Sequence, residues 1–171
     1  METEPTAKGL HASRPTKELN MVHTPGKAYE IRYESRPKYL FAYAKGDLSK
    51  PETRIACWKE IIERCRGENY DRLLVVQDSP PNKSVSEAFT AASGVVELGV
   101  DRLKIAFVDP DPAEFENNKF CEVVATNRGA NAKLFLTEGP AREWLVSESV
   151  SAFEPGRSAG LESTPLRTTK N

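Results

Sequence analysis

The apolar residues of the chain recur with two periods, which predicts a fold that mixes strands and helices. Tyr29, Ile31 and Tyr33 alternate with charged residues, the pattern of a strand with one face in water. Residues 39–44 form a second apolar stretch after a short turn that contains Pro37. Because the link is so short, these two strands should pair antiparallel.

Three later stretches predict further strands. Residues 73–76, Leu-Leu-Val-Val, are four apolar residues in a row and indicate a strand buried on both faces. Residues 103–108 and 132–136 predict the two strands that follow it along the chain.

In the segments between and after these strands, apolar residues recur at helical spacing, which predicts helices. Residues 140–146 predict a short last helix. The first three helices each begin with a capping pair, namely Ser49 with Glu52, Ser84 with Glu87, and Asp111 with Glu114. Their buried faces are expected to be Ile55, Trp58, Ile61, Ile62 and Cys65; Ala88, Phe89, Ala92, Val95 and Val96; and Phe115, Phe120, Val123 and Val124.

The predicted order of elements is β-β-α-β-α-β-α-β-α. Strands that are separated by a helix need right-handed crossovers and are parallel, whereas the hairpin adds an antiparallel edge strand. The sequence therefore predicts an α/β domain with a single mixed β-sheet and helices packed on it, at residues 28–147. Residues 1–27 and 148–171 show no apolar period, so we expect a disordered N-terminal arm and a disordered C-terminal tail.

Composition and the positions of the histidines argue against several classes of function. The net charge of −1 gives no electrostatic signal for nucleic acid or an anionic membrane, and no apolar run reaches the roughly 20 residues that span a bilayer. The N-terminus lacks the apolar core of a secretion signal, so we expect a cytoplasmic protein. His11 and His23 both lie in the arm, which excludes a histidine base or a His-rich metal site in the folded domain.

The three cysteines, Cys57, Cys65 and Cys121, indicate buried free thiols. Cys57 and Cys65 are eight residues apart in a predicted helix, about 12 Å along its axis, which is too far for a disulfide. No phosphate-binding loop, zinc spacing or nucleophile motif is present in the sequence. We therefore expect no catalytic residue, no metal and no cofactor.

The segment after the 73–76 strand is the candidate binding loop. It contains Asp78, Ser79, Asn82 and Lys83 and ends at the predicted start of the second helix. In open α/β folds, ligands and reactive groups gather where a parallel strand gives way to a loop and a helix. A metal-dependent activity that uses Asp78 with Asp109 is a further hypothesis, although carboxylates at such positions more often cap loops and helices.

A second candidate surface is Asn127 with Arg128, where Arg128 would reach an acidic group on a partner. The alternative is a helix C-terminus, in which Gly129 takes the left-handed conformation and Arg128 complements the helix dipole.

Two stretches resemble the STAS family, the SpoIIAA-like fold of anti-sigma-factor antagonists. Residues 40–48, Leu-Phe-Ala-Tyr-Ala-Lys-Gly-Asp-Leu, resemble the turn into the first STAS helix. Residues 104–145 resemble small, mostly uncharacterised bacterial proteins of that fold, on the segments Lys-Ile-Ala-Phe-Val at 104–108, Phe-Cys-Glu-Val-Val-Ala-Thr-Asn-Arg-Gly at 120–129, Leu-Phe at 134–135 and Glu-Trp-Leu at 143–145.

The resemblance implies a regulatory, non-enzymatic protein-interaction module whose partners are a serine kinase and an anti-sigma-type regulator. STAS antagonists are phosphorylated on a serine of an Asp-Ser-Ser-Gly motif at the start of the second helix. The matching place here is Lys83-Ser84-Val85-Ser86-Glu87, so Ser84 and Ser86 are the candidate phosphoacceptors. Capping already explains Ser84, which favours Ser86.

The alternative function is the binding of a small apolar, lipid-like molecule. STAS-like folds are similar to CRAL-TRIO lipid carriers, which hold an apolar molecule against the sheet. Tyr39, Phe41 and Tyr43 share one face of the second strand and are the candidate lining, unless a helix covers them.

Overall fold

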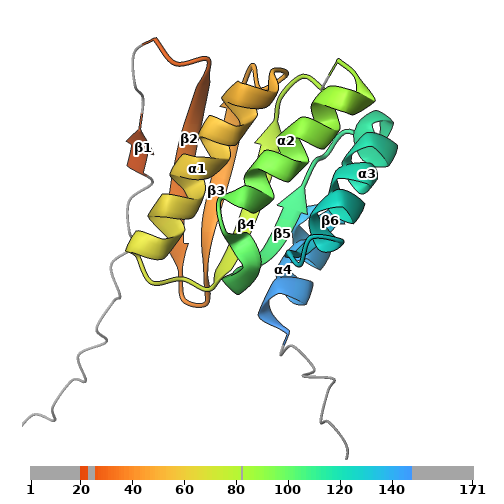
Figure 1. Ribbon diagram of the computed structural model, residues 1–171. Coiled ribbons are helices and arrows are strands. Elements are labelled where there is room, and N and C mark those ends of the chain that lie inside the picture. The colour runs from red at the N-terminus through yellow and green to blue at the C-terminus, as the bar shows by residue number, and fades with distance from the viewer. Residues whose placement is uncertain (1–19, 23–25, 82, 148–171) are drawn as a thin grey trace, which may run out of the picture.

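A single mixed sheet organises the computed structural model, which describes residues 20–22, 26–81 and 83–147 (Figure 1). Its strands, in their order across the sheet, are β1 (Asn20–Val22), β2 (Tyr29–Arg36), β3 (Tyr39–Gly46), β4 (Arg72–Asp78), β5 (Lys104–Val108) and β6 (Asn131–Phe135). The first three strands pair antiparallel, and β3 to β6 pair parallel. The α/β class and the mixed sheet are as the sequence predicts.

The strand β1 is one element more than the sequence predicts. Residues 20–22 lie inside the segment that the sequence assigns to a disordered arm, but they pair with β2, with Met21 opposite Arg32. Three residues are too few to show a period, so no pattern could reveal this strand. The other residues of the predicted arm up to residue 19, and the tail from residue 148, lie outside the described residues.

Helices cover the two faces of the sheet unequally. The helices are α1 (Pro51–Gly67), α2 (Val85–Glu97), α3 (Phe115–Thr126) and α4 (Glu138–Val146), with short 3-10 turns η1 (Val100–Arg102) and η2 (Pro112–Glu114) before β5 and α3. The first three lie side by side on one face, and α4 lies behind the sheet (Figure 1). Each parallel crossover turns in the same right-handed sense and strand order never reverses, so α1, α2 and α3 stay on one side.

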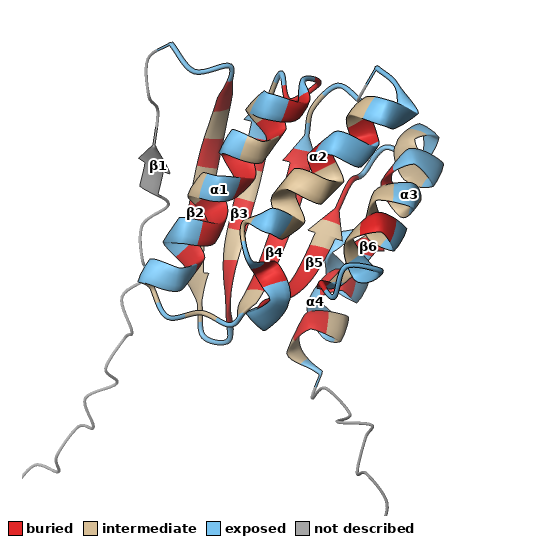
Figure 2. Cartoon of the chain, in the orientation of Figure 1, coloured by how far each residue is buried: buried red, intermediate tan, exposed pale blue. Residues whose placement is uncertain are grey.

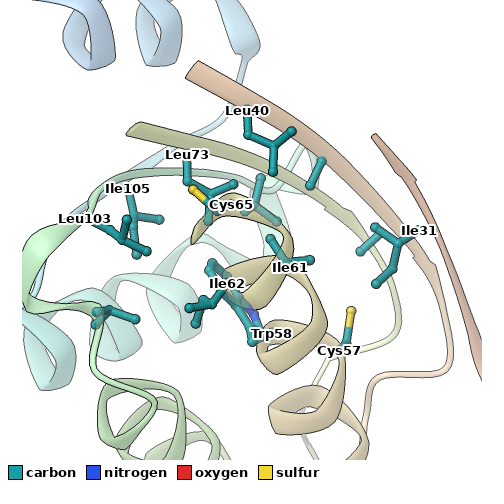
Figure 3. Packing of buried hydrophobic residues seen from close by; sticks show 14 of the residues in the cluster. Ile31, Leu40, Cys57, Trp58, Ile61, Ile62, Cys65, Leu73, Leu103 and Ile105 are labelled. Atoms are coloured by element: carbon teal, nitrogen blue, oxygen red, sulfur yellow. The ribbon is translucent and has the colours of Figure 1, made fainter. Parts of the chain in front are cut away.

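Strand β4 separates two apolar clusters. Leu73 and Val75 belong to the cluster under α1, whereas Leu74 and Val76 belong to the cluster under α4. Leu73, Leu74 and Val75 are fully buried, as predicted for a strand covered on both faces. In the cluster under α1, Trp58, Ile61 and Ile62 point from the helix toward the sheet (Figure 3).

The first helix begins one residue later than predicted. Lys50, not Ser49, is its N-cap residue, and Pro51 is the first helical residue. A proline keeps the residue before it out of the helical region, which places the boundary between Lys50 and Pro51. The Ser49 hydroxyl instead donates to Asp47 Oδ1 at 2.6 Å, so the predicted pair with Glu52 is wrong.

The third helix also begins differently from the prediction. Asp111 Oδ1 accepts from the backbone N–H of Ala113 at 2.9 Å, so Asp111 caps the turn η2 and α3 follows it.

The predicted buried faces of α2 and α3 are partly wrong. Phe89 on α2 and Phe120 and Val123 on α3 are exposed on the surface. Ala88 on α2 and Val124 on α3 are buried as predicted, and the other buried residues of these helices are Ala91 and Asn118. Figure 2 shows how much of these two helices is exposed, in contrast to the buried strands beneath them.

Candidate functional site

The loops at the carboxyl ends of β3, β4 and β5 form the edge where the sequence places the binding loop. Asp47 follows β3, residues 79–84 connect β4 to α2, and Asp109 follows β5. Arg54 from the first turn of α1 links two of these loops, because its Nε donates to the carbonyl of Leu48 at 3.0 Å and its Nη2 to that of Pro80 at 3.4 Å.

Ser84 is the N-cap residue of α2, as predicted. Its Oγ accepts from the backbone N–H of Glu87 at 3.2 Å. The Glu87 carboxylate completes the cap by accepting from the backbone N–H of Lys83 at 2.9 Å, one residue before the expected partner. A phosphate on Ser84 would disrupt this cap.

Ser86 lies in the first turn of α2 beside two exposed apolar side chains. Val85 is 64% exposed and Phe89 is 43% exposed, and their spacing of four residues places them on one face of the helix. Ser86 is itself exposed. The start of α2 therefore presents a hydroxyl group next to an apolar strip.

The neighbouring helix α3 also carries exposed apolar side chains. Cys121 Sγ lies 3.8 Å from the carbonyl oxygen of Ala88, which places the middle of α3 against the start of α2. Phe120, the neighbour of Cys121, is 36% exposed, and Val123 one turn later is 45% exposed.

Asp78 and Ser79 begin the loop with interactions of their own. Asp78 Oδ2 accepts from the Tyr43 hydroxyl at 2.9 Å and lies 3.4 Å from Lys45 Nζ, and these two contacts lower the pKa of the Asp78 carboxyl. Ser79 Oγ accepts from Gln77 Nε2 at 2.9 Å. Asn82, which the sequence also assigns to the binding loop, lies outside the described residues.

Asp78 and Asp109 do not face each other. Val76 pairs with Val108, so Asp78 and Asp109 are one step out of register and point to opposite faces of the sheet. Asp109 accepts from Asn118 Nδ2 at 2.8 Å and from the backbone N–H of Asp111 at 3.0 Å. Within residues 26–81 and 83–147, no group of three acidic, cysteine or histidine side chains could hold a metal ion. The geometry thus gives the two-aspartate hypothesis no support.

Arg128 is exposed, and its guanidinium lies along the surface of α3 and against Phe89. Its Nη1 donates to the carbonyl of Val124 at 3.3 Å, and its guanidinium lies 5.0 Å from the centre of the Phe89 ring. Gly129 has φ +89°, and the backbone N–H of Asn127 donates to the carbonyl of Val123 at 3.0 Å. These contacts are those of a helix C-terminus, so the structure favours that interpretation of Asn127 and Arg128.

The opposite face of the sheet carries an open hollow over β2 and β3. Its volume is about 240 Å³, and it is lined by Arg32, Tyr33, Glu34, Phe41 and Tyr43. Helix α4 packs on β4, β5 and β6, which leaves Phe41 and Tyr43 half-buried beside it. Of the three aromatic residues predicted as a lining, only Tyr39 is in the core, at 4% exposure.

A second cavity lies on the helical side, between the sheet and helices α2 and α3. Its volume is about 90 Å³. Its polar lining comes from Arg54, Gln77, Asn118, Cys121, Glu122 and Lys133, and most of the remaining wall is apolar. The sequence prediction did not single out Arg54. The signal was present, because Arg54 precedes Trp58 by four residues and so occupies the buried face of α1.

Cys57 and Cys65 are free and buried, as predicted. Burial raises the pKa of the Cys57 thiol to about 12 and that of the Cys65 thiol to about 11. Cys121 is half-buried, and burial raises its pKa as well. High pKa values keep thiols protonated at neutral pH, and only thiolates are nucleophilic. The cysteines therefore do not provide an activated nucleophile.

Comparisons with known proteins identify no relative of this chain: no family model matches it, and neither does any curated protein or any solved structure. In the described part of the chain, no helix has the length and apolar character to cross a membrane.

Proposed function

We propose that this chain is a non-enzymatic, STAS-like regulatory module that binds a protein partner through the loop of residues 79–86 and the start of α2. The observation that carries the proposal is the exposed apolar strip of Val85 and Phe89 beside this loop. Single exposed apolar residues are ordinary on protein surfaces. Two exposed apolar residues on one helix face, with exposed Phe120 and Val123 on the neighbouring helix, are typical of an interaction surface.

Two further features support the STAS-like assignment. Residues 40–48 resemble the turn into the first STAS helix, and they form the end of β3 and the loop before α1. The strands β3 to β6 alternate with helices that cover one face of the sheet. Both features concern the fold, and the choice of partner depends on the loop and the α2 surface.

Phosphorylation of Ser86 would switch this surface. Ser86 is the second residue of α2, where free backbone N–H groups and the helix dipole favour a phosphate. The carboxylate of Glu87 opposes the added charge, although the backbone N–H of Lys83 already binds it. A doubly charged group next to Val85 and Phe89 would repel a partner that buries these side chains.

The test is affinity capture from cells that naturally produce the protein, with the full chain as bait. A serine kinase or an anti-sigma-type regulator should be recovered. Its yield should fall by about tenfold or more with the Phe89→Glu variant, because a charge in the centre of an apolar interface abolishes a major contact. Leu136→Glu is the matched control, since Leu136 is also an exposed apolar residue, at 39%, but lies between β6 and α4.

Two outcomes contradict the proposal. One is the recovery of no partner of these classes by the full chain. The other is an equal yield with Phe89→Glu and with the unchanged chain. Phosphopeptide mapping of the same cells tests the switch separately, and the absence of phosphate from both Ser84 and Ser86 would exclude it.

A small apolar ligand is the second candidate function, and the hollow over β2 and β3 favours it. Phe41 and Tyr43 offer an apolar floor, and the volume of about 240 Å³ is slightly below the usual range of ligand pockets, about 300–1,000 Å³. The Arg36 guanidinium packs on the Phe41 ring, 4.6 Å from its centre. Native mass spectrometry of the full chain, purified without detergent, should then reveal a bound small molecule, and its absence would reject this function.

A further inference from the structure

Arg54 is a buried charge without a hydrogen-bonded carboxylate partner. Its side chain belongs to a residue that is only 7% exposed, and both of its hydrogen-bond partners are neutral backbone carbonyls, those of Leu48 and Pro80. Among the described residues, no carboxylate forms an ion pair with it. Because a guanidinium stays protonated in proteins, a buried one is stabilised by an anion that accepts its hydrogen bonds.

The carboxylates of Asp109 and Glu114 attract Arg54 electrostatically, but neither accepts a hydrogen bond from its guanidinium. The two oxygens of Asp109 accept from Asn118 and from the backbone N–H of Asp111 instead. Burial has the largest effect on the pKa of Arg54 and lowers it, whereas the two carboxylates raise it. Arg54 also lines the cavity, where its guanidinium can donate to a bound anion.

That cavity has one polar end and one apolar end. Arg54 is in the first turn of α1, Gln77 is near the end of β4, and Asn118 is in the first turn of α3, so all three lie at the carboxyl edge of the parallel strands. Ile105 and Ala130 line the cavity near the starts of β5 and β6, at the opposite edge. Between the two ends the wall is mostly apolar.

We propose that this cavity binds a small carboxylate with an apolar body. The carboxylate accepts hydrogen bonds from the Arg54 guanidinium, and the hydrocarbon lies between helices α2 and α3 and strands β5 and β6. Arginine suits this role because its planar donors match the two oxygens of a carboxylate. A cavity of about 150 Å³ holds the six carbons of benzene, so the 90 Å³ here suit a carboxylate of about four carbons in all.

This inference is independent of the proposed partner surface. Val85 and Phe89 do not line the cavity, and the cavity is distinct from the hollow over β2 and β3. Bound ligand and bound partner can therefore be tested one at a time.

The experiment titrates the full chain with sodium butyrate at constant ionic strength and follows binding by calorimetry and by the NMR signals of the Asn118 and Gln77 side-chain amides. Butan-1-ol, which has the same apolar body without the charge, is the matched ligand, and sodium chloride tests for an adventitious ion only. We expect butyrate to bind at least about tenfold more tightly than butan-1-ol and to shift both amide signals.

Variants on α1 test the residue. Arg54→Met keeps most of the side-chain volume and removes the charge, so it should weaken butyrate binding by about tenfold or more. Arg64→Met is the control, since Arg64 lies on the same helix with an exposed side chain paired to Glu68. If Arg54→Met does not fold, the comparison of butyrate with butan-1-ol on the unchanged chain still tests whether the cavity recognises a carboxylate.

Three results would overturn the proposal. They are equal binding of butyrate and butan-1-ol, butyrate binding that leaves the Asn118 and Gln77 amides unmoved, and chloride producing the same shifts as butyrate. No detectable binding of butyrate would overturn it as well.

Discussion

Gly46 is the position where the backbone leaves least room for a side chain, and Gly46→Ala is expected to destabilise the domain strongly. Gly46 pairs with Tyr29 at the end of the β2–β3 ladder and has φ +137°. A Cβ atom there would lie 2.4 Å from the carbonyl oxygen of Ala28 and 2.6 Å from the Cα of Tyr29. Both are backbone atoms, and the Ala28 carbonyl also accepts from the N–H of Asp47 at 2.9 Å.

The magnitude follows from these contacts. Holding an alanine at this φ costs about 1–3 kcal/mol, and moving the strand end away from Ala28 also weakens the bond to Asp47. We expect a loss of about 3 kcal/mol or more from a total that is typically about 5–15 kcal/mol, with a fall in Tm of roughly 10 °C.

The assay is urea unfolding followed by far-UV circular dichroism, with Gly67→Ala as the control. Gly67 is the last residue of α1, and a Cβ there meets nothing within 4 Å. Alanine in a helix is favoured over glycine by about 1 kcal/mol, so this variant should be slightly more stable than the unchanged chain. A free energy of unfolding for Gly46→Ala within about 0.5 kcal/mol of the unchanged chain would refute the reasoning.

Three further predictions concern a cap, the thiols and a carboxylate. Ser84→Ala should lower the free energy of unfolding by about 1 kcal/mol in urea titrations, because α2 loses the side-chain acceptor of its N-cap. Cys57 and Cys65, with pKa values of about 12 and about 11, should not react with a thiol reagent at pH 8 in the folded protein, and both should react in urea. Asp78→Asn should destabilise the domain at pH 7 but not in strong acid. The lowered pKa of Asp78 stabilises the fold above the ordinary carboxyl pKa of about 3.9, and this contribution is lost as the pH falls through the folded-state value. Equal pH dependence of the two proteins' unfolding would contradict this.

Some of the fold follows directly from local sequence. The four consecutive apolar residues of 73–76 predict a strand buried on both faces, and β4 is buried in this way. Ser84 followed by Glu87 predicts a helix start because both side chains satisfy free backbone donors nearby. In both cases the interactions that decide the structure lie within a few residues of each other.

Other features depend on distant contacts that no local pattern contains. The helical period places Phe89 on the buried face of α2 together with Ala88, but only Ala88 is buried, and Ala91 joins it there. Small residues at these positions let the helix approach its neighbours. Gly94 illustrates the closeness of α1 and α2, since a Cβ there would lie 2.4 Å from Ile55 Cδ1. The capping pair of Ser49 and Glu52 predicts a start of α1 one residue too early. The restriction that Pro51 places on Lys50 decides the boundary.

The sequence predicts the position of the candidate site but not which of its side chains are exposed. The loop after β4 and the first turn of α2 could be assigned from the strand-loop-helix pattern. The exposure of Val85 and Phe89 could not be predicted, because apolar residues at helical spacing indicate a buried face until the packing of the helix is known. Arg54 could have been noticed as a charged residue on the buried face of α1, whereas its two carbonyl partners come from separate loops.

Hydrogen exchange on the complex tests the partner-binding surface most directly. The full chain is compared with and without the partner recovered by affinity capture, peptide by peptide. The proposed function predicts slower exchange in peptides that cover residues 79–90 and unchanged exchange in those that cover the turn between β6 and α4. Protection confined to other parts of the chain, or no protection at all, would contradict it.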